Sequence, residues 1–239
     1  MIEIKNVSTS YSKGIKVIDH MDLTIESGTV FGFIGPNGAG KTTTLEMITG
    51  VLGIDEGDIF IDGKSIQKNP IEAKKQFGFV PDNPDVFEKL TGIEYLNFIG
   101  DVYSVDAKTR LEKVEKLAKE FNIYDSLKDR IQSYSHGMKQ KLLIISVLLH
   151  NPKNWILDEP MTGLDPKASY TLKTLMREHA SQGNTVFFST HVLEVAEKLC
   201  DKIAVIDKGK IVYCGMVEDL KEKSKENSSL EEAFLKIIE

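Results

Sequence analysis

The chain has 239 residues with a formal net charge of −6, and 41% of them are hydrophobic and 28% charged. This length and composition are those of a globular protein large enough for an α/β domain with an inserted subdomain. The acidic net charge argues against a fold that binds nucleic acid over its whole surface, but it does not exclude a local basic patch. The longest apolar run, Leu142 to Leu149, is too short to span a bilayer, the start lacks a signal-peptide pattern, and Cys200 and Cys214 fit reduced cytosolic thiols.

The first third of the chain has the pattern of a strand-rich core. Short β-branched and aromatic runs punctuated by Gly and Asp predict strands at residues 2–7, 23–25, 30–34, 59–61 and 77–80. The pattern changes near Leu90, where Thr91 followed three residues later by Glu94 forms a capping box. Apolar residues then recur at helical spacing as far as Leu149, so this middle region is predicted to be all helical.

Strands and helices alternate again after Pro152. Predicted strands lie at residues 155–157, 185–189 and 203–206, and predicted helices at 166–180 and 192–199. Residues 221–229 are polar and linker-like, and an apolar stripe predicts a short final helix. The sequence therefore predicts an α/β core of residues 1–83 and 151–222, a helical subdomain of residues 84–150 and a C-terminal helix of residues 228–239.

Residues 35–42 fit the phosphate-binding pattern G-x-x-x-x-G-K-[ST], between a predicted strand and a predicted helix. Backbone N–H groups of such a loop point at phosphate oxygens, and the helix N-terminus adds partial positive charge. We expect Lys41 to reach the β- and γ-phosphates and Thr42 to hold Mg²⁺. The candidate nucleotide-binding residues here are Gly35, Pro36, Asn37, Gly38, Ala39, Gly40, Lys41, Thr42 and Thr43.

Two acids follow the buried strand at residues 155–157. Asp158 at the end of this strand is placed to bind the same Mg²⁺ as Thr42. Glu159 would then orient or deprotonate a water that attacks the γ-phosphate. In a chain without a phosphate loop, this pair would instead be two solvated acids in a turn.

A second helix start has an unusual composition. Ser135 is a good N-cap for the helix that includes residues 139–149, which by itself means only a capped helix. Gly137, however, costs about 1 kcal/mol relative to alanine inside a helix. A glycine at this place makes sense if something must approach the backbone closely.

Taken in order, these motifs make the chain resemble the nucleotide-binding subunit of an ATP-binding cassette (ABC) transporter. Residues 35–42 match the Walker A loop of this family, Ser135 to Met138 its signature motif, and Asp158 and Glu159 its Walker B acid and catalytic glutamate. Gly163-Leu164-Asp165 is similar to its D-loop, and Ser189-Thr190-His191 to its switch region. The resemblance implies a P-loop NTPase core with an N-terminal antiparallel β portion, an inserted all-helical subdomain, and ATP and Mg²⁺ as cofactors.

The resemblance also implies a head-to-tail dimer. Each ATP would lie between the phosphate loop of one chain and Ser135 and Gly137 of the other, with Asp165 at the interface. His191 would hydrogen-bond the γ-phosphate, although a lone histidine after a strand is more often structural. Tyr11 occupies the position of the aromatic ring that stacks on adenine in the family.

Two motifs depart from the usual family pattern. Asp82 stands where a glutamine normally binds near Mg²⁺, and our hypothesis is that it still coordinates the metal through a water. The signature carries Tyr134, His136 and Met138 in place of Leu, Gly and Gln. This form resembles bacterial export ATPases of the drug, antibiotic-resistance and sodium-extrusion type, whose permease is a separate chain.

We therefore expect an ATPase that couples hydrolysis to a membrane permease, cytoplasmic and peripheral on the inner face of the cell membrane, as a homodimer or heterodimer. A soluble ABC ATPase acting on nucleic acid or ribosomes is the alternative, but the acidic chain carries one cassette and no heptad run, and no nucleic-acid partner is expected. A cassette that binds ATP without hydrolysis is a third interpretation, against which Glu159 argues.

Overall fold

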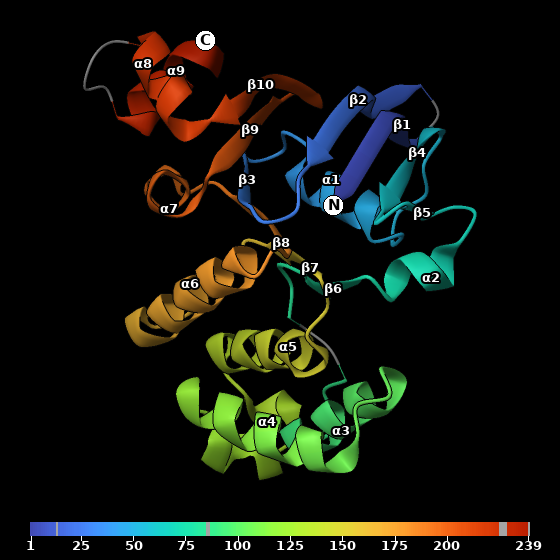
Figure 1. Cartoon of the computed structure of the whole chain (residues 1–239), viewed down its shortest axis with the longest axis vertical. Helices are drawn as coiled ribbons and strands as arrows, with labels where there is room; N and C mark the ends of the chain where they lie inside the picture. The colour runs from blue at the N-terminus through green and yellow to red at the C-terminus, as the bar shows by residue number, and fades with distance from the viewer. Residues whose placement is uncertain (13, 85–86, 225–228, 239) are drawn as a thin grey trace.

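The computed structural model describes residues 1–12, 14–84, 87–224 and 229–238. Two sheets form the upper part of the molecule in Figure 1, and a group of helices forms its lower end. The smaller sheet is antiparallel, in the order β2-β1-β4-β5. Its strands are β1 (Ile2–Ser12), β2 (Ile15–Ile25), β4 (Glu56–Ile61) and β5 (Lys64–Ser65).

The larger sheet has the order β10-β9-β3-β8-β7-β6, and its pairs are parallel except for β9 with β10. Three of the four inner strands, β3, β8 and β7, are buried along their whole length, as expected for parallel strands covered on both faces. The strands of this sheet are β3 (Val30–Ile34), β6 (Phe77–Val80), β7 (Asn154–Asp158), β8 (Thr185–Thr190), β9 (Lys202–Asp207) and β10 (Lys210–Met216).

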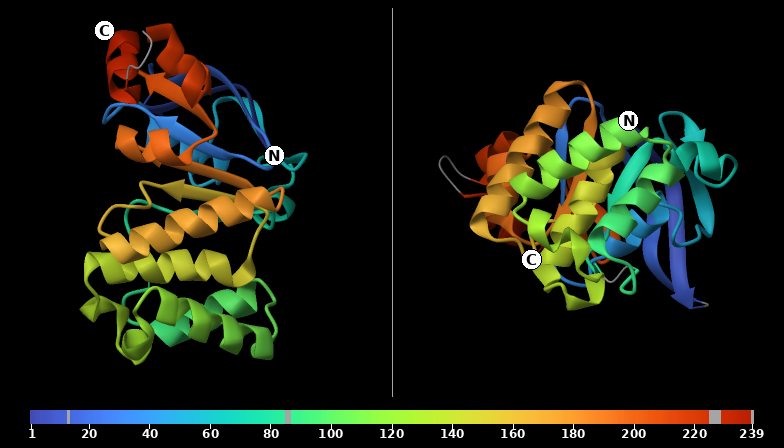
Figure 2. Two further views of the ribbon diagram at one scale, coloured as in Figure 1. Left: turned by 60° about the vertical axis from the view of Figure 1, so that its left-hand side comes forward. Right: turned by 90° about the horizontal axis from the view of Figure 1, so that it is seen from below.

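One group of helices lies at the lower end of the molecule, and the others lie beside the sheets or at the upper end (Figures 1 and 2). One group holds α3 (Gly92–Val102), α4 (Ala107–Glu120) and α5 (His136–His150), and between the described residues 87 and 150 there is no strand. The others are α1 (Lys41–Ile48), α2 (Pro70–Lys74), α6 (Pro166–Ser181), α7 (Leu193–Leu199), α8 (Val217–Ser224) and α9 (Leu230–Ile238). None of the described helices is long and apolar enough to cross a membrane.

Side-chain caps define where the helices of the lower group begin. The predicted capping box is present: the backbone N–H of Thr91 donates to Glu94 Oε2 at 2.8 Å, and that of Glu94 donates to Thr91 Oγ1 at 3.3 Å. Asp106 accepts from the N–H of Thr109 at 3.0 Å, and Ser135 from that of Met138 at 3.3 Å. Each cap satisfies an N–H that has no partner inside its helix.

The predicted α/β fold, with an antiparallel β portion and an inserted helical region, is confirmed. The strand predicted at 23–25 is the end of the longer β2, whereas β5, α2 and β10 were not predicted. The prediction of a linker from residue 221 is wrong for residues 221–224, which belong to α8. Helix α8 is held by its buried Val217 and Leu220, which precede the polar stretch. The rest of the predicted linker, residues 225–228, lies outside the described residues.

One buried core cluster contains apolar residues of both sheets. The Phe187 ring of β8 is fully buried, and its centroid lies 6.0 Å from that of Phe31 and 5.6 Å from that of Phe33, both on β3. These rings belong to a core cluster that also contains apolar residues of β1, β4 and α1. The two sheets are therefore held together by one shared core.

Replacement of Phe187 by alanine should lower the free energy of unfolding by about 3–5 kcal/mol, because it removes a large buried ring and leaves a cavity. Urea unfolding measures the change. Tyr170, whose side chain is 73% exposed on α6, is the control, and Tyr170→Ala should stay within about 0.5 kcal/mol of the parent. Equal losses for the two variants would contradict the proposed role of this core.

Candidate functional site

An open cavity of about 530 Å³ lies at the carboxyl ends of the inner parallel strands. Most of the site residues predicted from the sequence line this cavity, and they come from five separate segments of the chain. These lining residues are Tyr11, Asn37, Gly38, Gly40, Lys41, Thr42, Thr43, Asp82, Glu159 and His191. Segments almost two hundred residues apart in the chain therefore contribute to one site.

The loop before α1 is shaped by backbone geometry. Gly40 has φ 110°, in the left-handed region that favours glycine, and directly precedes the first residue of α1. The Lys41 side chain folds back over the loop, and its Nζ donates to the carbonyl oxygens of Gly35 at 2.8 Å and Pro36 at 3.2 Å. Burial lowers the pKa of Lys41, while the nearby charges of Glu159, Asp158 and Asp82 oppose this shift.

Ser189 of β8 connects the two acids that follow β7. Its hydroxyl donates to Asp158 Oδ1 and accepts from the backbone N–H of Glu159 at 3.0 Å. Asp158 is 1% exposed, and burial raises its pKa, whereas the hydroxyls of Ser189 and Thr42 lower it. Glu159 has φ 44°, a conformation that is uncommon for a residue with a side chain and that occurs often at functional sites.

The donor set beside Lys41 fits a magnesium ion. The second oxygen of Asp158, Oδ2, is buried and makes no hydrogen bond to any residue that the structure describes. An unpaired buried carboxylate oxygen is costly unless a cation or water takes it. Thr42 and Asp82 line the same cavity, and Mg²⁺ prefers such hard oxygen ligands with only one or two from carboxylates.

Glu159 is held between two cationic or polar groups. Its Oε1 lies 2.9 Å from Nδ1 of His191 and 3.9 Å from Nζ of Lys41. The carboxylate is 12% exposed, so it faces the cavity without being buried in the core. This arrangement gives Glu159 a fixed direction while it stays able to accept a proton.

Tyr11 stands at the edge of the cavity. Its ring is 64% exposed, and its hydroxyl lies 2.8 Å from Thr43 Oγ1 on α1. An exposed ring anchored at its polar end can offer its face to a planar ligand. Two further lining residues, Val17 and Thr162, escaped prediction; the β-branched pair Val17-Ile18 was the only local signal for the first.

Ser135 and Gly137 do not line this cavity. A Cβ atom built on Gly137 would lie 2.3 Å from the carbonyl oxygen of Gly163, so the close neighbour of this glycine is another loop of the same chain. Lys141 Nζ, one turn further along α5, pairs with Asp165 Oδ2 at 2.5 Å. The start of α5 and residues 163–165 therefore form one packed unit.

Comparisons with known proteins agree on one family. The family model described as "ABC transporter" matches residues 18–162, which is more than half of the chain. The chain belongs to the ABC transporter family. ATP binding and hydrolysis are general to this family, and the chain is an ATP-binding subunit of a transporter.

Individual relatives cover nearly the whole chain. The ABC transporter ATP-binding protein YhcH of Bacillus subtilis (strain 168) is 40% identical over 92% of this chain and 71% of its own length. The Nod factor export ATP-binding protein I of Cupriavidus metallidurans is 34% identical over 92% of this chain and 72% of its own. A solved structure of the ATP-binding subunit of an ABC transporter superposes over all of both chains with a TM-score of 0.95 and 30% identity.

A substitution at Gly137 tests its close contact with the carbonyl oxygen of Gly163. Gly137→Ala should destabilise the protein by about 1–3 kcal/mol, because the new methyl group meets the Gly163 backbone rather than a movable side chain. Alanine otherwise favours a helix, so a gain in stability would contradict the contact. Gly53→Ala, where no atom lies within 4 Å of the new Cβ, is the control in urea unfolding.

Proposed function

We propose that this ABC subunit hydrolyses MgATP in the cavity around Lys41 and that hydrolysis drives a separate membrane permease, for export. The observation that carries the proposal is the single cavity that brings the phosphate loop, Glu159 and His191 together. The Cupriavidus relative is a Nod factor export ATP-binding protein, which supports export, as does the resemblance of the signature region to export ATPases. Attachment to the inner face of the cell membrane would follow from the permease.

Different residues of the site would bind the phosphates and the metal ion. Lys41 would leave the carbonyls of Gly35 and Pro36 to contact the phosphates, with the backbone N–H groups of the loop. Thr42 and Asp158 would hold Mg²⁺ directly and Asp82 through a water. When bound, the metal neutralises charge on the phosphate oxygens.

Glu159 is the proposed general base. A water between its carboxylate and the γ-phosphate would lose its proton to Glu159 as the new oxygen–phosphorus bond forms. The bond from the γ-phosphorus to the bridging oxygen breaks in the same step, and ADP is the leaving group. The hydrogen bond from His191 Nδ1–H orients the carboxylate, and a γ-phosphate oxygen would accept from Nε2–H when the ring carries both protons. Tyr11 would stack on the adenine.

The remaining contacts would come from a second subunit. Ser135 lies at the N-terminus of the fifteen-residue helix α5, where free N–H groups and the helix dipole favour an anion. Because Ser135 and Gly137 do not line their own chain's cavity, we propose that they contact the γ-phosphate held by the partner in a head-to-tail dimer. ATP would close such a dimer, since it binds both halves only in the closed state.

Lys41→Ala should weaken ATP binding at least about tenfold, because a buried charged donor to the phosphates is lost. Isothermal titration with MgATP measures the affinity. Lys208→Ala, which removes a lysine whose side chain is 89% exposed, should leave the affinity unchanged. ATP binding by Lys41→Ala at the parental affinity would refute the phosphate-loop assignment.

Glu159→Gln should abolish hydrolysis and trap a dimer in the presence of MgATP, because the amide cannot accept the proton of the attacking water. Gel filtration with light scattering detects the dimer. The double variant Glu159→Gln, Ser135→Arg should bind ATP but remain monomeric, since the added side chain blocks the partner's phosphate site. A monomeric Glu159→Gln variant saturated with MgATP would count against the head-to-tail arrangement.

Asp82→Asn should lower ATPase activity and raise the Mg²⁺ concentration needed for half-maximal rate by about threefold to tenfold, because one carboxylate charge near the metal is lost. The measurement is a magnesium titration of the steady-state rate at saturating ATP. Asp55→Asn, outside the cavity, is the matched control. Unchanged activity and magnesium dependence in Asp82→Asn would exclude a role in coordination.

A further inference from the structure

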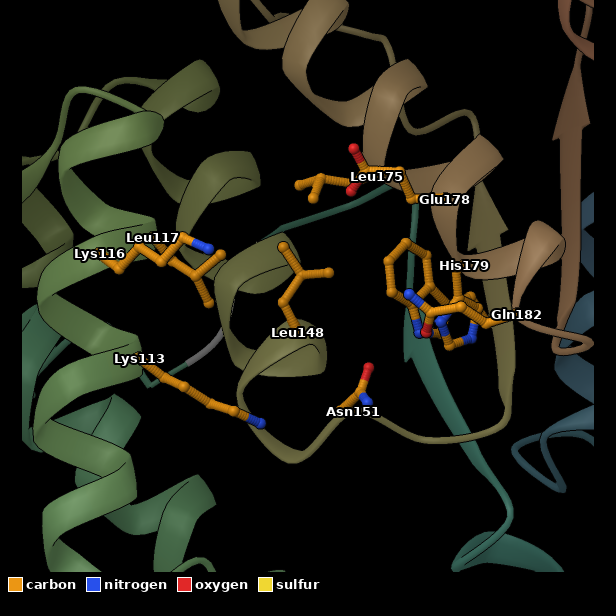
Figure 3. A pocket seen from close by; sticks show the side chains of 10 residues that line it. Lys113, Lys116, Leu117, Leu148, Asn151, Leu175, Glu178, His179 and Gln182 are labelled. Atoms are coloured by element: carbon orange, nitrogen blue, oxygen red, sulfur yellow. The ribbon is translucent and has the colours of Figure 1, made fainter.

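A second cavity, of about 260 Å³, lies between the helical region and the core. Figure 3 shows Lys113 and Lys116 of α4 on one side, Leu175, Glu178 and His179 of α6 on the facing side, and Leu148 of α5 between them. Trp155 of β7 completes the apolar wall. The cavity shares no lining residue with the nucleotide site.

The indole of Trp155 carries an unused hydrogen-bond donor. Trp155 is 3% exposed, and its Nε1–H has no hydrogen-bond partner among the residues that the structure describes. An indole nitrogen can only donate, and buried donors are nearly always paired. Lys116 and Gln182, which line the same cavity as Trp155, are exposed long side chains.

The Trp155 indole stacks on the ring of His179, which is uncharged. The His179 ring lies parallel to the indole, with centroids 4.0 Å apart and planes 16° apart. Its Nε2 lies 3.3 Å from the carbonyl oxygen of Lys153. Burial lowers the pKa of His179 to about 4, so the ring carries no charge near neutral pH.

The charges on the walls favour an anion. The charged residues described on the walls are two lysines and Glu178. Lys113 Nζ donates to the carbonyl oxygen of Leu149 at 3.0 Å, which occupies one of its three hydrogens. Lys116 Nζ lies 3.9 Å from Glu120 Oε1, and its side chain is 74% exposed.

We infer that this cavity is a binding site for a small organic carboxylate with a planar apolar body. The body would lie against Leu175 and Leu148, and the carboxylate would accept from the Trp155 N–H and face Lys113. The ligand would contact α4 and α5 on one side and β7 and α6 on the other. It would thus bridge the helical region and the core at a distance from the nucleotide.

The chain itself supplies the reporter, because Trp155 is its only tryptophan. Phenylacetate is the probe, added to the full chain without nucleotide, and tryptophan emission follows binding. We expect a saturable change in emission with phenylacetate. Phenylacetamide should bind with about tenfold lower affinity, because it lacks the charge that Lys113 attracts. Acetate should cause no change, because it lacks the apolar body. Equilibrium dialysis with labelled phenylacetate gives the stoichiometry without relying on the indole.

Two variants separate this cavity from other surfaces. Leu175→Phe should fill the space and abolish both signals, whereas Leu235→Phe, at an exposed position of α9, should leave both unchanged. Urea unfolding confirms that both variants fold. Absence of saturable binding, equal affinity for phenylacetate and phenylacetamide, or full binding to a folded Leu175→Phe variant would each overturn the inference, and none of these results depends on ATP hydrolysis.

Discussion

The register between β7 and β8 is the constraint on which the nucleotide site depends. It places Asp158 opposite Ser189, so that one hydroxyl can donate to the Asp158 carboxylate and accept from the Glu159 backbone. The adjoining register between β8 and β3 sets Thr190 opposite Ile34, directly before the phosphate loop. A slip of one residue would turn every side chain of a strand to the opposite face, and Ser189 would no longer meet Asp158.

The same strand order explains why local sequence signals were so informative here. A glycine-rich loop after an apolar strand and an acid pair after another are short-range patterns, and parallel strands bring their carboxyl ends to one edge. The bond between Ser189 and Asp158 joins residues 31 apart and has no local signature. Strand β10 alternates between exposed and half-buried positions, so its weak pattern did not stand out, and α8 begins with buried residues but continues as a polar stretch.

Gly137 shows how a correct signal can have more than one cause. Its presence in a helix predicted a close approach to the backbone, and the approach exists, but the neighbour within the chain is the carbonyl of Gly163. The segment from Glu159 to Asp165 is short, and the N–H of Thr162 donates to the carbonyl of Glu159 at 3.0 Å. With the pair between Lys141 and Asp165, this segment links the proposed base to the start of α5. In the proposed dimer, each chain would therefore supply the general base of one nucleotide site and the signature motif of the other site, and within that chain the two would be packed together.

The strand β7 also sets the relation between the nucleotide site and the second cavity. Asp158 and Trp155 lie three residues apart on it, a span of about 10 Å at the rise of a β-strand. Strand β7 is buried and paired on both sides, so a shift of this strand alone would break its pairing with β6 and β8. Any influence of a bound carboxylate on the nucleotide would instead act through the packing of α4 and α5 against α6, which the proposed ligand would also contact. A coupling between the two sites thus requires that these helices move relative to the core when nucleotide binds.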